Sequence, residues 1–477
     1  MGVARVQIQI VPEIQFPRYI NIVMSRLLAK KLEIETNPFL VTFGSATAKG
    51  AIAFTNKKNN LVRMSSRLAS QLKMINQSLI QARFDSRSLR LRFGPLLGIL
   101  INAEPQGKQE QLFGLMTRFL EECSAAGQSQ GVRVAVFSPE QIDLKSMEIG
   151  AWVREKGRWT FARLPLPDVI YNRITSRKLE QQEGIQNKLH QLKTYYHIPI
   201  FNEKFLNKYQ VYQILIKDER ARNMLPETYP FRISSFKELL QRYPTVYLKP
   251  NNGSLGSGII KVSRSDGKWI CQSATPSGTL TRTTKTLAEM SKLMAQKIGR
   301  QSYLVQQGLS LVKYDDRQMD FRVLVQKNRN GDWRVTSSVA RIANNQHIVS
   351  NLARGGTIRK AADVLKELNH IPGKPTDSDI KTTALEIAKT FEHLAEGHFA
   401  ELGIDLALDT KGKIWLIEIN SKPSKTDDTV INPTTNTRPS VLRLIDYVHF
   451  LTETAGGTHS PPFSPNSVRK IRGRGPI

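Results

Sequence analysis

The stretch that decides the fold is Gly403-Ile-Asp-Leu-Ala-Leu-Asp-Thr-Lys-Gly-Lys-Ile-Trp-Leu-Ile-Glu-Ile-Asn420. Its apolar residues are typical of buried strands, as at Leu406, Leu408, Ile414 and Leu416. Between them, Asp409-Thr-Lys-Gly412 predicts a tight turn in which Gly412 is free to adopt a positive φ. The stretch is therefore predicted to form a β-hairpin.

The polar residues of this hairpin suggest a cation site. Glu418 and Asn420 are two residues apart on one strand, so they share a face, and the antiparallel return can bring Asp405 beside them. Two carboxylates and an amide oxygen among apolar strands are costly to bury unless a cation neutralises them. Such ligands suit Mg²⁺ that also binds phosphates. The alternatives are a solvated hairpin edge, or carboxylates paired with Lys and Arg.

The composition indicates a folded, strongly basic protein. The chain has 477 residues, enough for about two to four domains, with 40% hydrophobic residues and a net charge of +28. Residues 1–95 contain 15 Lys and Arg against 4 Asp and Glu, a net charge of +11. Such charge attracts nucleotides, nucleic acid or acidic polymers without identifying one of them.

The cysteines and the apolar runs predict a cytoplasmic protein. Cys123 and Cys271 are far apart and have no metal-ligand spacing, so both are interpreted as ordinary thiols in a reducing compartment. We expect no membrane span, because the most apolar run, Phe93–Ile101, is short. No signal peptide is expected at the N-terminus.

Residues 1–200 divide into two expected domains. Residues 1–95 contain short alternating runs and one helix near Ser65–Lys73, which predicts a small basic β-rich domain. Its basic face is either simply solvated or binds an anionic polymer, and no nucleic-acid motif is present. Residues 96–200 are expected to form an open α/β sheet. Its expected elements are strands at Leu96–Ile101, Val132–Phe137 and Leu164–Tyr171 and a helix at Gln109–Ala125.

A second informative stretch combines a lysine with glycines. A strand ends at Lys249, and a loop with Gly253, Gly256 and Gly258 leads into the next strand. Glycines let backbone N–H groups approach an anion closely. A plain turn is the alternative interpretation, because a glycine-rich hairpin alone is weak evidence.

Two arginines lie within apolar strands. Arg322 is in the strand Asp320–Gln326, and Arg341 is in the returning strand Trp333–Ile342. An unpaired guanidinium would be costly there, so each must meet an anion. That anion is either a structural carboxylate or a phosphate.

The last part of the chain reads as two helices and a tail. A core helix is expected near Ser378–His398 and a final helix near Ser440–Thr454. Residues 456–477 are rich in Pro, Ser and Gly, with four basic residues and no acid, and are expected to form a disordered basic tail.

Taken in order, these motifs resemble the ATP-grasp superfamily, over roughly residues 165–455. The motifs are Lys208 on a helix, Lys249 with its glycine loop, Arg322 and Arg341, Asn351 before Gly355-Gly356, and Asp405…Glu418-x-Asn420. Over its whole length the chain resembles the YheC/YheD family of bacterial endospore-coat-associated ATP-grasp proteins. The resemblance implies an α/β multidomain protein in which an ATP-grasp fold follows the two N-terminal domains. Its two subdomains would be residues 201–305, with the glycine-rich lid, and 306–455, with the metal site.

The resemblance also implies residue roles. Lys208 and Lys249 would neutralise the α- and β-phosphates of ATP, and backbone amides at Ser254, Gly256, Ser257 and Gly258 would cover the phosphates. Main-chain groups of Gln306, Gln307 and Leu309 would hold adenine. Asp405, Glu418 and Asn420 would hold Mg²⁺, which Mn²⁺ can replace. Arg322, Arg341 and Asn351 would stabilise the transferring phosphoryl group.

Two positions depart from the pattern of the relatives. Many relatives have a Glu that binds the ribose near the hinge strand, where this chain has Gln306-Gln307, so Asp315 or Asp316 would have to substitute. After Asn420 the chain reads Ser421-Lys422-Pro423-Ser424, where related ligases often have Ser-Pro-Gly. This segment would face the acceptor, so the acceptor is expected to differ.

Two functions follow as expectations. The first is an ATP- and Mg²⁺-dependent ligase that joins an unidentified carboxylate to an amine through an acyl-phosphate; a kinase-like transfer is a variant of it. The second is an ATP-binding assembly protein of the endospore coat without turnover. It would have an acidic coat component as partner, and no specific nucleic acid.

Overall fold

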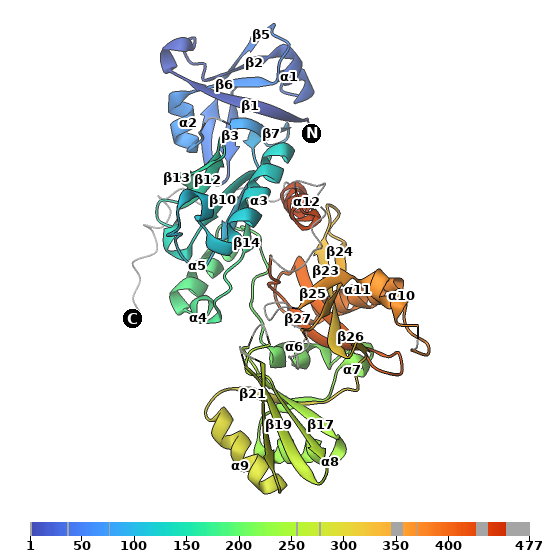
Figure 1. The fold of residues 1–477 in the computed structure, drawn as a ribbon. Coiled ribbons are helices and arrows are strands. Elements are labelled where there is room, and N and C mark those ends of the chain that lie inside the picture. Colours follow the sequence, from blue (N-terminus) through green and yellow to red (C-terminus); the bar gives the residue numbers. More distant parts are fainter. Residues whose placement is uncertain are drawn as a thin grey trace, which may run out of the picture. The chain divides into compact units, whose positions relative to one another are not determined.

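The computed structural model describes residues 2–35, 38–75, 77–253, 256–275, 278–344, 356–369, 371–425 and 437–454 (Figure 1). They form two compact units. Unit 1 contains the residues up to Glu203, the turn Asn328–Gly331 and the C-terminal helix from Val441. Unit 2 contains Lys204–Lys327 and Asp332–Ser440. This division is coarser than the five segments expected from the sequence, whose boundaries stay a prediction.

The N-terminal part of unit 1 is β-rich, as expected. Its sheet has eight strands in the order β4-β3-β8-β7-β1-β6-β2-β5. The strands are β1 (Val3–Val11), β2 (Ile22–Ser25), β3 (Phe39–Phe43), β4 (Ala46–Gly50), β5 (Ile52–Thr55), β6 (Leu61–Ser65), β7 (Gln77–Asp85) and β8 (Arg90–Phe93). Two helices interrupt them, the expected α2 (Ser66–Leu72) and the unexpected α1 (Arg26–Lys31). Each begins after a serine whose side chain accepts the N–H of a leucine three residues on.

The second sheet of unit 1 is the expected open α/β sheet. Its order is β11-β12-β10-β9-β14-β15, with β13 paired to β12. The strands are β9 (Leu96–Leu100), β10 (Arg133–Phe137), β11 (Ile142–Asp143), β12 (Glu148–Glu155), β13 (Arg158–Pro165), β14 (Val169–Asn172) and β15 (Ile200–Phe201). The helices are α3 (Thr117–Gln130), α4 (Arg177–Glu180), α5 (Glu183–Thr194) and α12 (Pro439–Thr454). One hydrophobic core joins residues from both sheets of this unit.

Two sequence predictions in this unit were wrong. The helix expected from Gln109 starts only at Thr117, because Gly114 has φ +56° and two short 3-10 turns take the place of the first helical turns. The single strand expected at Leu164–Tyr171 is two strands, because Pro165 and Pro167 cannot donate ladder hydrogen bonds.

Helix α12 is bound to unit 1 by aromatic and ionic contacts. Tyr447 makes an edge contact with Phe201, with ring centroids 5.5 Å apart. Glu453 accepts from Arg329 at 2.7 Å. His449 is buried, and the Nδ1 atom of its imidazole has no hydrogen-bond partner among the described residues.

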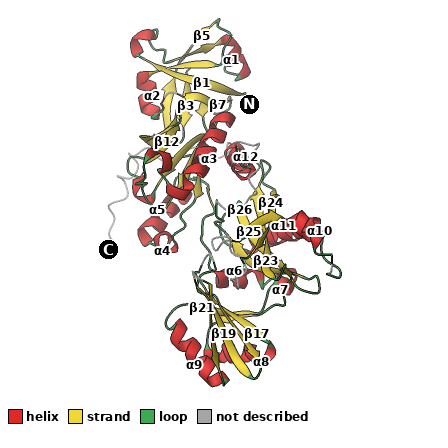
Figure 2. Ribbon diagram, in the orientation of Figure 1, coloured by secondary structure: helices red, strands yellow, loops and turns green. Residues whose placement is uncertain are grey.

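Unit 2 begins with a six-stranded sheet in the order β16-β21-β17-β18-β19-β20. Its strands are β16 (Thr228–Pro230), β17 (Thr245–Pro250), β18 (Ile260–Ser265), β19 (Lys268–Thr275), β20 (Gly278–Thr284) and β21 (Tyr303–Gln307). Helices α8 (Ile233–Arg242) and α9 (Leu287–Ile298) pack together on it, as Figure 2 shows. The hairpin predicted around Lys249 is confirmed, since β17 and β18 are antiparallel neighbours.

The second sheet of unit 2 has the order β25-β24-β23-β26-β27, with β22 paired to β23. Its strands are β22 (Lys313–Tyr314), β23 (Arg317–Lys327), β24 (Trp333–Ile342), β25 (Thr357–Lys360), β26 (Glu401–Leu408) and β27 (Ile414–Asn420). The helices of this part are α6 (Lys208–Leu215), α7 (Glu219–Met224), α10 (Ala361–Glu367) and α11 (Asp377–Leu394). The hairpin predicted at Gly403–Asn420 is confirmed as β26 and β27.

Neither Cys123 nor Cys271 forms a disulfide, as interpreted from the sequence, and both are buried. Within the described ranges, no helix has the length and apolarity needed to cross a membrane.

Candidate functional site

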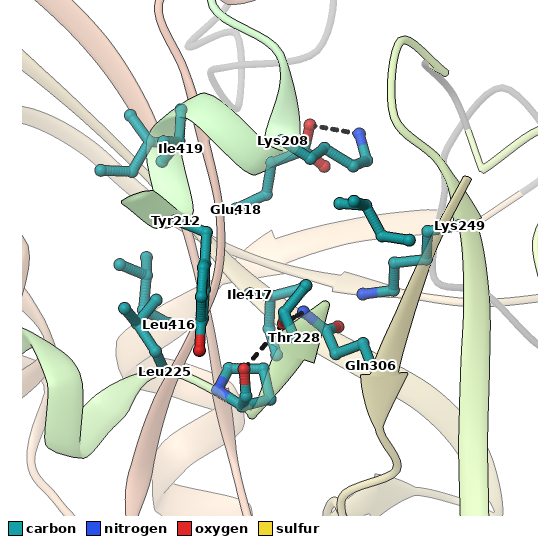
Figure 3. Close-up of a pocket in the computed structure, with 13 residues that line it drawn as sticks. Lys208, Tyr212, Leu225, Thr228, Lys249, Gln306, Leu416, Ile417, Glu418 and Ile419 are labelled. Atoms are coloured by element: carbon teal, nitrogen blue, oxygen red, sulfur yellow. Dashed lines mark hydrogen bonds and ion pairs between the residues drawn. The ribbon is translucent and has the colours of Figure 1, made fainter. Parts of the chain in front are cut away.

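A pocket in unit 2 brings together four of the residues singled out from the sequence. Lys208, Lys249, Gln306 and Glu418 line it together (Figure 3). The other lining residues are mainly apolar: Val211, Tyr212, Leu225, Pro226, Thr228, Leu304, Leu416, Ile417 and Ile419. The pocket therefore combines an apolar part with a charged part.

Lys208 is placed by the start of helix α6. Asn207 caps this helix through a capping box with Gln210, which fixes Lys208 as the first helical residue. Its ammonium donates to the Gly253 carbonyl at 2.9 Å and to Glu418 Oε1 at 2.7 Å. The lysine thus connects helix α6, the start of the glycine loop and strand β27.

Lys249 extends from strand β17 into the pocket (Figure 3). Among the described residues, no acceptor lies within hydrogen-bond distance of its ammonium. The pKa of Lys249 is lowered to about 8, mainly by burial and then by the charge of Lys208, against the opposing charges of Glu418, Asp405 and Asp320. This cation therefore lacks a full counter-charge.

The two acidic residues of the hairpin face each other. Asp405 of β26 is the direct cross-strand partner of Glu418, and Gly403 is opposite Asn420. The register shifts just after Asp405, so Ile417 is an extra residue on β27. The alternation predicted from the sequence is thus retained at the three polar positions, on adjacent strands.

Asp405 is nevertheless bound by arginines. Its carboxylate, 4% exposed, accepts from Arg322 at two positions, one of them 3.0 Å, and from Arg341 Nη2 at 2.9 Å. Arg341 also donates to both oxygens of Asp320, at 2.6 and 2.8 Å. Burial alone would raise the pKa of Asp405, but the two guanidiniums lower it. The sequence left open whether each arginine meets a structural carboxylate or a phosphate. The structure pairs both arginines with structural carboxylates.

A hydrogen-bond relay orients Gln306 at the apolar end of the pocket. Its Nε2 donates to Thr228 Oγ1 at 2.8 Å, and that hydroxyl donates to the Pro226 carbonyl at 2.8 Å (Figure 3). The amide nitrogen is therefore engaged, which leaves Gln306 Oε1 as the acceptor.

The neighbouring residue Gln307 is tied to Glu227. Its N–H donates to the Glu227 carbonyl at 2.8 Å, and its side-chain oxygen accepts the Glu227 N–H at 3.2 Å. Gly308 N–H donates to the Thr245 carbonyl at 2.8 Å. The Gln307 N–H, which was expected to hold adenine, therefore already has a protein acceptor, as has that of its neighbour Gly308, and Leu309 is the next residue along the chain.

The remaining expected residues are not all in the pocket. Gly256 and Gly258 have φ of +66° and +73°, and Ser257 between them is exposed, as a glycine loop requires. Ser254 and Asn351 lie outside the described residues.

The carboxylates expected to replace the ribose ligand form part of a tight turn. Asp315 and Asp316 both have positive φ, 47° and 58°, between β22 and β23. Asp315 accepts from Arg317 at 3.2 Å. In the part of the chain that the structure describes, neither lines the pocket.

The candidate donor set only partly suits a divalent cation. No cluster of three or more His, Cys, Asp and Glu side chains suited to a metal occurs among the described residues. Of the three candidate ligands, Glu418 lines the pocket, while Asp405 is its cross-strand partner and Asn420 is two residues further along β27. Glu418 is half-buried and bound by one lysine, so its carboxylate suits a Mg²⁺ ligand. Asp405 could be a ligand only if its carboxylate oxygens bound the cation and the arginines together.

Several residues of the site were not singled out from the sequence. Tyr212 forms one wall of the pocket, and burial raises the pKa of its hydroxyl. Asp320 is the direct cross-strand partner of Arg341. The motif Asp320-Phe-Arg322 contained the signal for Asp320, since alternate residues of a strand share a face.

Comparisons with known proteins agree with this geometry. The YheC/D-like ATP-grasp family model matches residues 197–451. The endospore coat-associated protein YheD of Bacillus subtilis (strain 168) is 31% identical, over 80% of this chain and 84% of that protein. The endospore coat-associated protein YheC of the same strain is 24% identical, over 64% of this chain and 84% of that protein.

Among solved structures, the ATP-grasp ligase PsnB complexed with a minimal precursor is similar at 12% identity. The match covers 75% of this chain and 99% of that one, with a TM-score of 0.43. The family model covers more than half of the chain, and the similarity to YheD extends over most of it. The chain therefore belongs to the YheC/YheD family of ATP-grasp proteins.

Proposed function

We propose that this protein is an ATP- and Mg²⁺-dependent ligase that joins a carboxylate to an amine through an acyl-phosphate. The observation that supports it best is the ammonium of Lys249, which has no acceptor among the described residues and lies in a pocket shared with Lys208 and Glu418. A partly desolvated cation without a full counter-charge favours binding of a polyanion.

The pocket suits a nucleoside triphosphate. Its apolar walls, including Tyr212 and Leu416, would enclose the base, and Gln306 Oε1 would accept an N–H from the base edge. Lys208 and Lys249 would neutralise the α- and β-phosphates. Glycine-loop amides, at Ser254, Gly256, Ser257 and Gly258, would close over them.

Glu418 and Asn420 would hold Mg²⁺, with Asp405 as the ligand shared with the arginines. When bound, the cation neutralises charge on the β- and γ-phosphates. Mn²⁺ would be able to take the place of Mg²⁺ at this site. The protein's own contribution is to place these three side chains on adjacent strands, with Lys208 donating to Glu418.

The reaction then proceeds in two displacements. A substrate carboxylate oxygen forms a bond to the γ-phosphorus while the bond to the β,γ-bridging oxygen breaks, which gives ADP and an acyl-phosphate. The amine nitrogen then bonds to the acyl carbon, the carbon–oxygen bond to phosphate breaks, and the nitrogen loses a proton. Arg322 and Arg341, with Asn351, would stabilise the phosphoryl oxygens in both steps.

The test is a screen for ADP release with mixed carboxylate and amine acceptors. The expected result is ADP release that needs both a divalent metal and an acceptor pair. Glu418→Ala serves as the blank. Release that continues unchanged in this variant, or without metal, contradicts the proposal. Release that needs only one acceptor indicates a kinase-like transfer.

A second function is an ATP-binding protein of the endospore coat, in which nucleotide binding controls assembly. Both curated relatives favour it, since each is named as an endospore coat-associated protein. The +11 charge of residues 1–95 and the basic tail 456–477 would then meet an acidic coat component. Binding to such a component should weaken with salt, and an absence of salt dependence contradicts this function.

A further inference from the structure

One face of the eight-stranded sheet in unit 1 concentrates positive charge. The strands β4, β3, β8, β7 and β1 are neighbours in this order. They contain one acidic residue and five basic ones: Lys49 on β4, Arg90 and Arg92 on β8, Arg83 on β7 and Arg5 on β1. The strand register places all five on the same side of the sheet, and we call this set the basic face.

On strands β7 and β8 the arginines are direct neighbours. Arg83 is directly opposite Arg92, and Arg90 is opposite Asp85, the one acidic residue of these strands. Residues directly opposite each other on antiparallel strands point to the same side, with Cβ atoms about 5 Å apart. The three arginines therefore share their side of the sheet with a single carboxylate.

The outer strands continue this face. Lys49 of β4 is opposite Leu40 of β3, and Leu40 is paired on its other side with Arg90. Arg5 of β1 is opposite Gln81, which is two residues before the arginine of β7 and so points to the same side. The residues that alternate with the basic ones are buried in the core on the opposite side: Ala4, Ala82, Phe84, Leu91 and Phe93.

The five strands do not balance this charge themselves. Like charges directly opposite each other destabilise a sheet, as at the arginine pair of β7 and β8. The pKa of Arg90 is lowered, mainly by burial and then by the charge of Arg92, against the opposing charge of Asp85. Asp85 already accepts from the Arg87 N–H at 3.0 Å and from the Ser88 hydroxyl at 2.7 Å. The one carboxylate of these strands is thus engaged in the turn between β7 and β8.

The basic face is wide and partly exposed. Lys49 and Arg5 are exposed, and the arginines of β7 and β8 are half-buried. Arg5 also donates to the Ser129 carbonyl at 3.0 Å, which holds its side chain at one end of the face. From β4 to β1 there are four strand spacings, about 19 Å in all, which an extended peptide covers with about six residues.

We infer that the basic face binds an acidic, extended segment of a partner protein. Carboxylates of such a segment pair with the cations and relieve the repulsion between β7 and β8. Single-stranded nucleic acid fits less well, because the aromatic residues of these strands are buried in the core and offer no surface for base stacking. They are Phe39, Phe43, Phe84 and Phe93.

This inference rests on the second proposed function, since it gives the acidic coat component a binding surface, and it does not require ligase turnover. The test is fluorescence anisotropy of the full-length protein with a labelled polyglutamate peptide of about ten residues, long enough to cross the face. A labelled oligothymidylate of the same length is titrated in parallel. We expect the peptide to bind more tightly than the oligonucleotide, with an affinity that falls as salt is added.

The decisive variant is Arg83→Gln with Arg92→Gln, which should bind the peptide about tenfold more weakly. Its matched control is Lys57→Gln with Lys58→Gln, which removes the same charge from the exposed loop after β5. Strand β5 is separated from β7 by β1, β6 and β2 in the sheet. The control should lose less than about twofold. Should the arginine variant fail to fold, Lys49→Glu on the exposed edge strand should weaken binding in the same direction.

Equal losses in the arginine variant and in the control overturn the inference, because general charge then suffices. Salt-dependent binding in that case leaves the second function standing without this face. A wild type that does not bind the peptide contradicts both. Tighter binding of the oligothymidylate, lost in the arginine variant, also overturns the inference, because the face then binds nucleic acid.

Discussion

Asp405 and Glu418 are direct cross-strand partners, yet different cations bind their carboxylates. Asp405 is bound by Arg322 and Arg341, whereas Glu418 is bound by Lys208. The side chain of Asp405 is 6% exposed, and that of Glu418 is 28% exposed. Without a ligand, Asp405 therefore pairs with buried arginines, whereas Glu418 pairs with a lysine at the pocket.

This difference predicts unequal effects on stability without ligand. Asp405→Asn removes a carboxylate that two buried guanidiniums share, and should lower the free energy of unfolding by about 3 kcal/mol. The matched change Glu418→Gln breaks a more exposed pair and should cost less than about 1 kcal/mol. Urea unfolding in the absence of nucleotide and metal measures both. Equal losses would show that Asp405 does not anchor the arginines.

Lys249 predicts a pH-dependent affinity for nucleotide. Its pKa is lowered from 10.5 to about 8, so the fraction of charged ammonium falls as pH rises through 8. If the charged form binds the phosphates, the Kd for ATP should rise about tenfold between pH 7 and pH 9. Calorimetric titration at a series of pH values tests this. In Lys249→Arg, which stays charged, the affinity should be flat over that range; a slope like that of the wild type would implicate another group.

His449 predicts acid sensitivity of unit 1. The pKa of His449 is lowered from 6.5 to about 4, mainly by burial and also by the charges of Arg329 and Arg5, against Glu453 and a backbone hydrogen bond to Gln130. The unfolded chain then binds more protons than the native one between these values. Stability is complete above about pH 6.5 and falls by about 3 kcal/mol as pH falls to about 4.

The measurement is urea unfolding at pH 7 and pH 4 for the wild type and for His449→Gln. Glutamine keeps a donor and does not titrate, so the variant should lose less stability on acidification. An identical loss in the two proteins would place the acid sensitivity elsewhere.

A buried ion pair fixes the segment that follows Asn420. Lys425 donates to Glu401 at 2.5 Å, each side chain is 3% exposed, and Gln326 donates to the same carboxylate at 2.8 Å. Lys425→Met leaves Glu401 buried without its cation and should cost about 3 kcal/mol. Lys425→Met with Glu401→Gln removes both charges and should recover most of that loss. A double variant as unstable as the single one would mean that the lost packing, and not the unpaired charge, is the cause.

The hairpin could be predicted because its signals are local. Apolar residues on both sides of the turn Asp409-Thr-Lys-Gly412 define two strands, and their pairing places Asp405 beside Glu418. The sequence also predicted that Arg322 and Arg341 each bind an anion, because both lie in apolar strands. The identity of that anion could not be predicted, since Asp405 is more than sixty residues away along the chain and its contact depends on the order of strands in the sheet.

The residues that form the pocket walls, and the start of helix α3, also could not be predicted from local sequence patterns. Tyr212 and Leu416 meet only through tertiary packing, which no local pattern reports. The start of helix α3 depended on the conformation of Gly114, which can adopt either sign of φ. The roles of Ser254 and Asn351 stay predictions from the family resemblance.

The most direct test of the account is calorimetric titration with a non-hydrolysable ATP analogue, with and without Mg²⁺, in the wild type and in Glu418→Ala. The account predicts binding in the wild type that is at least about tenfold tighter with Mg²⁺, and an affinity in Glu418→Ala that no longer depends on the metal. Equal affinity with and without Mg²⁺ in the wild type, or an undiminished metal effect in the variant, would contradict it.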